Sequence, residues 1–261
     1  MSTFSLAVRD SSTMLRRNLL HARRYPSLTL NLLLTPVMLL LLFVYIFGDT
    51  MSAGIGGTDR SDYIAYIVPG ILLMTIGSTV VGTAVSVSND MTEGIIARFR
   101  TMAIHRGSVL VGHVIGSVLQ AVASVVLVGA VGVAIGFRSV DATVLEWLAA
   151  FGLLVLFALA LTWIAVGMGL ISPNAEAAGN NAMPLILLPL LSSAFTPVES
   201  MPGWFQPVAE YQPFTPAIET LRGLLLGTEI GNNGWLAIAW CLALTVLGYF
   251  WSTAKFNNDP K

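Results

Sequence analysis

The side chains that could do chemistry are few in this chain, and they are scattered along it. There are three histidines and one cysteine, Cys241, so no metal-type spacing of these residues exists. The only lysines are Lys255 and Lys261, and no GxxxxGK(S/T) loop is present to hold the phosphates of ATP. No nucleophile with a nearby base stands out. The sequence therefore predicts a protein that is not itself an enzyme and that holds no metal or cofactor of its own.

Six long apolar runs, separated by short polar gaps, make up most of the sequence. Apolar residues account for 55% of the chain and charged residues for 10%, whereas soluble domains carry about 25% charged residues. The run at 28–47 has no charge, and a helix of that length covers roughly 30 Å, the thickness of a bilayer's hydrocarbon core. We predict an all-α membrane protein with six transmembrane helices, near residues 28–47, 63–88, 108–136, 145–171, 180–197 and 234–252.

Two of these spans have features that leave alternatives open. The fifth is short and contains Pro184 and Pro189, which fits either a kinked span or a re-entrant loop. The third has GxxxG pairs that begin at Gly112 and Gly132. Small residues let helices approach closely in lipid, so these pairs indicate packing within the chain or a dimer seam.

The division of positive charge predicts the orientation of the spans. With the N-terminus in the cytoplasm, ten lysines and arginines fall on the inner side and three, Arg60, Arg138 and Arg222, on the outer side. An even number of spans then returns the C-terminus to the cytoplasm. The expected location is the cell membrane. A net charge of −1 leaves no basic field that would indicate nucleic acid.

The predicted spans contain almost no titratable residue, which bears on the source of energy for any transport. Proton-coupled carriers place Asp, Glu or His within the membrane, because the proton needs a titratable group there. His113, near the inner end of the third span, is interpreted as a snorkelling or hydrogen-bonded histidine. Proton coupling is therefore disfavoured. Transport driven by ATP would need an ATPase on a separate chain that docks on the cytoplasmic face.

Two cytoplasmic segments have the patterns of helices. Residues 4–24, within an N-terminal segment 1–27, predict an amphipathic helix in the lipid interface, which could also contact a partner. In the 89–107 gap, Asp90 and Glu93 have the spacing of a capping box with Asp90 at the N-cap. Ile95, Phe99 and Met102 then line one face of a short helix. Such a stripe indicates packing on the lipid surface or in a partner's groove.

The segment 198–233, between the fifth and sixth spans, is long for a loop and rich in proline. Leu221, Leu224 and Leu225, with Glu219 and Arg222 among them, predict a short amphipathic helix. The segment is interpreted as an extracellular cap with re-entrant helices, or as a gate. The chain is thus one transmembrane domain over 1–261, with spans one to five in 28–197, the cap at 198–233, the sixth span at 234–252 and a cytoplasmic tail at 253–261.

Three strings along the chain resemble those of one family of membrane proteins. The string GIIARFRTMAI at 94–104 resembles a segment between spans two and three that ends in an Arg-Phe-Arg-Ser-Leu-Pro-Ile-like sequence. SAFTPV at 193–198 with MPGW at 201–204, and QPFTP at 212–216 with LRG at 221–223, follow in the same order. The chain resembles an ABC-2 type permease of the daunorubicin/doxorubicin-resistance exporter kind. It departs from the family at Ala97, where an acidic residue is common, and at Ala103, where proline is usual.

The resemblance implies a mechanism and partners. Two permease chains, here a homodimer, would pair with two copies of an ATPase that bind ATP and Mg²⁺, and the segment between spans two and three would be the coupling helix. ATP binding would then move a hydrophobic small molecule outward through the pair. The residues expected at the ATPase are Glu93, Gly94, Arg98, Phe99, Arg100 and Met102. Met74 and Phe195 are candidates for the substrate path, although packing within the bundle is the alternative for both.

Other functions stay open at this point. A polysaccharide or lipid-linked glycan exporter would favour stacked Trp and Tyr along the path, and few stand in mid-span apart from Trp163 and Trp240. A membrane enzyme would need a convergent polar set, which the sequence lacks. A membrane scaffold without transport is the third alternative.

Overall fold

The structure, a computed structural model, describes residues 26–54, 59–92, 106–139 and 142–258, and every regular element in these ranges is helical. The long helices are α4 (Arg60–Thr92), α6 (Arg106–Ile135), α7 (Val144–Ile171) and α12 (Asn233–Asn258). Before them come α2 (Pro26–Leu42), the π-helical stretch η1 (Phe43–Phe47) and α3 (Gly48–Gly54). Between α7 and α12 lie α8 (Ala175–Ala182), α9 (Pro184–Leu187), η2 (Leu188–Leu191), η3 (Val198–Ser200), α10 (Gln206–Tyr211) and α11 (Phe214–Leu226).

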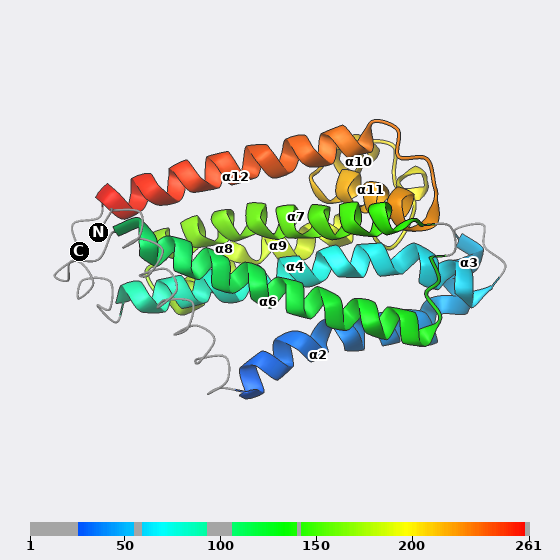
Figure 1. The fold of residues 1–261 in the computed structure, drawn as a ribbon, viewed down its shortest axis with the longest axis horizontal. Helices are drawn as coiled ribbons and strands as arrows, with labels where there is room; N and C mark the ends of the chain where they lie inside the picture. Colours follow the sequence, from blue (N-terminus) through cyan, green and yellow to red (C-terminus); the bar gives the residue numbers. More distant parts are fainter. Residues whose placement is uncertain (1–25, 55–58, 93–105, 140–141, 259–261) are drawn as a thin grey trace.

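The four long helices are long and apolar enough to cross a membrane. The shortest of them, α12, has 26 residues and is therefore roughly 39 Å long, more than the hydrocarbon core requires. They run side by side along the length of the molecule (Figure 1). We call the end where α4 finishes and α6 begins the Thr92 end, and the opposite one the Arg60 end. These helices confirm the predicted all-helical membrane architecture, whereas the count of six spans stays a prediction.

The predicted first span, 28–47, lies within one continuous helical stretch from Pro26 to Gly54. Its π-helical part, Phe43–Phe47, follows two turns after Pro36, which lacks a backbone donor. A π-helical turn widens a helix locally and changes the direction of the side chains around it. Here it places the ring of Phe43 against Phe195, 4.6 Å away between centroids. The first helical segment thus contacts the last residues of the predicted fifth span.

The predicted fifth span, 180–197, is broken into α8, α9 and η2. Pro184 is at the first turn of α9, and Pro189 lies in the 3₁₀ turn η2. Each proline removes a backbone N–H, so a single straight helix cannot continue through both. After η2 the chain is extended or turning up to Pro197.

The broken segment, by which we mean residues 175–197, packs along α4 in an antiparallel direction. Two glycines of α4 fix the register, because a Cβ at Gly77 would clash with the carbonyl oxygen of Leu185 and a Cβ at Gly70 would lie 2.8 Å from the backbone of Ala194. Nearer the Thr92 end, Gly179 of the broken segment faces Val85. Between Val85 and Gly70, α4 rises by roughly 22 Å. The segment therefore follows α4 over most of a membrane's thickness.

Burial identifies α4 as the central helix of the bundle. In the most apolar window of each helix, 72% of the residues of α4 are buried, against 17% for α12. The larger apolar cluster surrounds α4 with side chains of α7 and α11, such as Phe157 and Phe214. A smaller cluster at the Thr92 end joins α4, α6, α7 and α12 through Val87, Leu110, Val166 and Phe256. The exposed apolar side chains of α12 suit contact with lipid tails.

Glycine at position 169 permits a close approach of α7 to α4. A Cβ there would lie 2.5 Å from the carbonyl oxygen of Ala84, whereas a Cβ at Gly152, on the same helix, would meet no atom within 4 Å. We expect Gly169→Ala to lower the free energy of unfolding by about 1–3 kcal/mol, because overpacking shifts the backbone. Gly152→Ala should leave it unchanged or raise it slightly, since alanine favours the helix. Thermal unfolding in detergent measures both, and equal melting temperatures for the two variants would contradict this packing.

Candidate functional site

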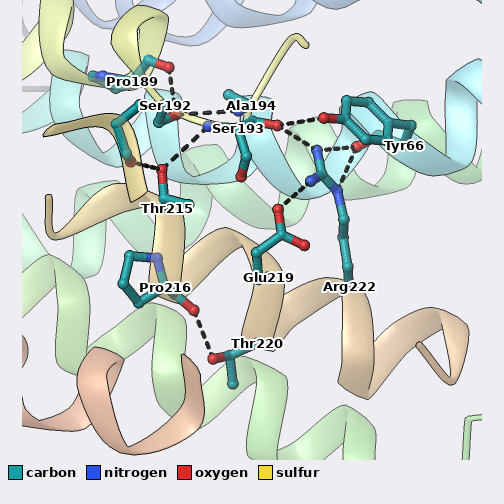
Figure 2. A network of polar contacts seen from close by, with 11 residues as sticks. Tyr66, Pro189, Ser192, Ser193, Ala194, Thr215, Pro216, Glu219, Thr220 and Arg222 are labelled. Carbon is teal, nitrogen blue, oxygen red and sulfur yellow. Dashed lines mark hydrogen bonds and ion pairs between the residues drawn. The ribbon is translucent and has the colours of Figure 1, made fainter. Parts of the chain in front are cut away.

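A buried arginine organises the polar contacts near the Arg60 end (Figure 2). Arg222, on α11, is only 5% exposed. Its Nε and Nη2 donate to the carbonyl oxygen of Tyr66 on α4, at 3.1 and 3.0 Å, and Nη2 also donates to the carbonyl oxygen of Ser193 at 2.7 Å. Its Nη1 lies 2.6 Å from a carboxylate oxygen of Glu219. All three guanidinium nitrogens therefore have partners, and the group also stacks on the ring of Tyr66, 3.6 Å from its centroid.

The non-helical stretch after η2 is held by side chains on both sides of it. The hydroxyl of Tyr66 donates to the carbonyl oxygen of Ser193 at 2.9 Å, and the N–H of Ser193 donates to Oγ1 of Thr215 at 3.2 Å. The N–H of Ala194 donates to Oγ of Ser192 at 3.1 Å. Figure 2 shows these contacts meeting between α4 and α11. The network thus joins the central helix, the broken segment and the short helix α11.

The chemistry of this network is binding and positioning. The Glu219 carboxylate is engaged by Arg222, and the hydroxyls of Ser192 and Thr220 donate to backbone carbonyl oxygens rather than to a base. Within the described ranges, no three His, Cys, Asp or Glu side chains come close enough to hold a metal ion. A buried guanidinium that is bonded to a carboxylate and two carbonyl oxygens holds these elements together by strong, directional contacts, because charged hydrogen bonds are stronger than neutral ones.

The two residues expected in a substrate path have different surroundings. Phe195 follows the Arg222 network directly, is 8% exposed and lies against Phe43 of η1. Met74, on α4, is partly buried and packs against the larger apolar cluster. Phe195 therefore stands where the first segment, the broken segment and the network meet, whereas Met74 belongs to the packing around the central helix.

The residues expected to dock an ATPase lie outside the described residues: Glu93, Gly94, Arg98, Phe99, Arg100 and Met102. The expected amphipathic helix at 4–24 lies outside them as well. The structure describes the helices on each side of the 93–105 segment, and both of those helix ends are at the Thr92 end of the bundle.

The expectation that Asp90 caps the docking helix is wrong. Helix α4 continues through Thr92, so Asp90 lies inside it rather than at the N-cap of a new helix. Its carboxylate is buried and lies 2.9 Å from Nε2 of His113 on α6. The spacing to Glu93 suggested a capping box, but the apolar helix before it had not ended. His113 is the hydrogen-bonded histidine that its position in the sequence suggested.

Sequence reasoning did not identify Arg222 as a buried group. It counted this residue among the three cations of the outer side and placed it in a short amphipathic helix. One signal was present: Glu219 stands three residues before it on the same helix face, a spacing at which opposite charges pair. Its partners on Tyr66 and Ser193 are distant in sequence, and no local pattern indicates them.

Comparison with known proteins places this bundle in a family. The family model of the ABC-2 type transporter matches residues 10–226 of the chain. The match covers most of the chain and includes α4, the broken segment and α11, so the chain belongs to the ABC-2 type transporter family.

Individual relatives agree with this assignment. The chain is 29% identical over 224 residues to the daunorubicin resistance ABC transporter permease protein DrrB1 of Streptomyces coeruleorubidus, which covers 85% of this chain and 77% of the relative. It is 22% identical over 186 residues to the probable doxorubicin resistance ABC transporter permease protein DrrC of Mycobacterium tuberculosis, over 69% of this chain and 65% of the relative. It is 25% identical over 234 residues to nodulation protein J of Rhizobium meliloti, over 82% of each. The resemblance to the drug-resistance permeases is confirmed.

We expect Arg222→Gln to destabilise the protein by on the order of 3 kcal/mol, because it leaves a partly buried carboxylate and two carbonyl oxygens without their charged donor. Arg60→Gln is the matched control, since Arg60 pairs with Asp49 at 2.9 Å on the surface and such pairs contribute little. Unfolding in detergent, followed by tryptophan fluorescence, compares the two variants. A similar effect of both substitutions would show that the buried network does not hold the fold.

Proposed function

We propose that this chain is the transmembrane permease subunit of an ATP-driven exporter that moves a hydrophobic small molecule out of the cell. The observation that carries the proposal is the family match over residues 10–226. Two of the relatives are named for daunorubicin or doxorubicin resistance, which supports a drug-like, apolar solute. The four long apolar helices fit a conduit across the membrane.

The source of energy in this proposal is a separate ATPase that binds ATP and Mg²⁺. It docks on the segment between α4 and α6, where Glu93 caps a short coupling helix and Gly94, Arg98, Phe99, Arg100 and Met102 contact the partner. A small set of apolar and arginine anchors is the usual composition of such an interface. Two ATPase copies serve two permease chains, and nucleotide binding drives transport only by favouring one state of the pair over the other.

The Thr92 end of the bundle is then cytoplasmic. The excess of lysine and arginine on the predicted inner side supports this orientation. The stretch from Pro26 to Gly54 and the broken segment along α4 complete six spans with the four long helices. Non-helical backbone is tolerated at membrane depth only where protein buries it, and the Arg222 network provides that cover for the stretch after η2.

The solute's path in this proposal runs past Phe195 and Phe43, between the first and fifth spans, with Met74 deeper on α4. A second permease chain closes the other side of that path. The aromatic residues in mid-span favour an apolar solute over a glycan. Trp163 is buried in the smaller cluster, and the indole N–H of Trp240 donates to the carbonyl oxygen of Tyr211. Trp163 is therefore engaged in packing, and the polar atom of Trp240 already has a partner within the chain.

Phe99→Asp is expected to abolish drug-stimulated ATP hydrolysis by the assembled complex, with daunorubicin as the probe, and to reduce copurification of the ATPase. The reason is that a charge replaces an apolar anchor of the docking helix. Membrane insertion should not change, because the segment lies between two spans.

Ala97→Asp is the matched control for that variant. It adds the same charge two residues away, off the Ile95–Phe99–Met102 stripe and at a position where the family often has an acidic residue. We expect it to retain both ATPase binding and stimulation. If Phe99→Asp binds and stimulates the ATPase as the unmodified chain does, the docking hypothesis is wrong.

A further inference from the structure

Helices α4 and α6 are joined by polar contacts along an otherwise apolar seam. At the Thr92 end, the carboxylate of Asp90 lies 2.9 Å from Nε2 of His113. Further along, the hydroxyl of Thr83 donates to Oγ of Ser117. His113 and Ser117 are one turn apart on α6, and Asp90 and Thr83 are two turns apart on α4, so both contacts lie on one face of each helix. Two polar bonds therefore fix the register of α4 against α6.

The Asp90–His113 contact is buried at the end of the bundle that holds the smaller apolar cluster. Asp90 is 7% exposed and His113 is 5% exposed. The smaller apolar cluster at this end includes Val87 from α4 and Leu110 and Val114 from α6. Taking a carboxylate out of water is costly, and an apolar pair of similar volume gives equal or better stability. The pair is therefore better explained by the register that it sets between α4 and α6 than by the stability that it adds.

The pair sets the relative position of the two helix ends that flank the 93–105 segment. Asp90 is two residues from the end of α4, and His113 is two turns into α6. The 93–105 segment connects these helices, and no other described element lies between them in the sequence. A force applied to that segment reaches α4 and α6 through these two helix ends. If these two helix ends could slide past each other, the displacement would not be transmitted to the rest of the bundle.

We propose that Asp90 and His113 are positioning residues for coupling, which make α4 and α6 move as one body with the docking segment. The proposal rests on the proposed function. Coupling between distant sites requires elements that keep their internal arrangement while the whole changes state. The hydrogen bond provides this, because it permits one register only, whereas apolar contact alone permits small shifts of a helix. The contact between Thr83 and Ser117 continues the same register further along the seam.

The first test follows motion in the complete complex with the ATPase. In a chain with Cys241 replaced by Ser, spin labels are placed at Asn89 and Ile115, which are exposed residues beside the pair on α4 and α6. A second labelled chain carries its spin labels at Asn89 on α4 and at Phe250 on α12. Trapping with ATP and vanadate should leave the α4–α6 distance unchanged to within about 2 Å, the size of a small helix shift, and should change the α4–α12 distance by more. A change between α4 and α6, or no change in either pair, would overturn the proposal.

The second test replaces both residues of the pair with apolar side chains. In Asp90→Leu with His113→Phe, the ATPase should still copurify and the melting temperature should stay close to that of the unmodified chain. Drug-stimulated hydrolysis should fall by roughly two- to thirty-fold, the range seen for residues that transmit coupling. The exchanged pair, Asp90→His with His113→Asp, should recover at least half of the loss. A purely structural role predicts that the apolar pair couples as well as the original.

These tests are separable from the proposed function. If Phe99→Asp fails to uncouple the complex, the docking hypothesis fails and with it the basis of this inference. If Phe99→Asp uncouples and the apolar pair does not, docking stands and the role of Asp90 and His113 is wrong. The spin-label measurement uses the native pair, so it gives a result even where the substituted chain does not fold.

Discussion

The structure depends on one constraint, which is that backbone N–H and C=O groups within a bilayer must find partners inside the protein. A straight helix meets this requirement by itself, and the four long helices do so. The segment from Ala175 to Pro197 does not, because Pro184 and Pro189 interrupt it and the chain leaves helical geometry after η2. Its backbone groups therefore need donors and acceptors from elsewhere.

Side chains from two other elements supply those partners. The carbonyl oxygen of Ser193 accepts from both Arg222 and the hydroxyl of Tyr66, and the N–H of Ser193 donates to Thr215. One turn earlier, the amide of Gln212 donates to the carbonyl oxygen of Leu188. These donors lie on α4 and on the segment 212–222, and α11 packs against α4, α7 and α12. The buried positions of Ile218 and Leu221 follow from this packing.

The extent to which the sequence predicts this molecule follows from the range of each interaction. Long apolar runs depend on composition alone, so four of the predicted spans appear as single helices close to their expected bounds. Arg222 bonds to residues that are 156 and 29 positions away in the sequence. The periodicity of a helix or strand gives no information about contacts at such separations. Asp90 shows a different limit. Its spacing to Glu93 matches a capping box, but a local motif cannot reveal that the preceding helix extends to Thr92 or that His113 lies opposite.

The Arg222 network and the Asp90–His113 contact both involve α4, so this helix is bonded to its neighbours near each of its ends. Near its Arg60 end it is bonded to α11 and to the broken segment through Tyr66, and near its other end it is bonded to α6 through Asp90. Between these points, Gly77 and Gly70 bring the broken segment against it with no side chain between. An element tied by directional bonds at both ends and close-packed along its length cannot bend independently of its neighbours. Under the proposed function, a displacement of α4 would carry α6 at one end and the stretch containing Phe195 at the other, and would so link the proposed docking segment to the region of the proposed path.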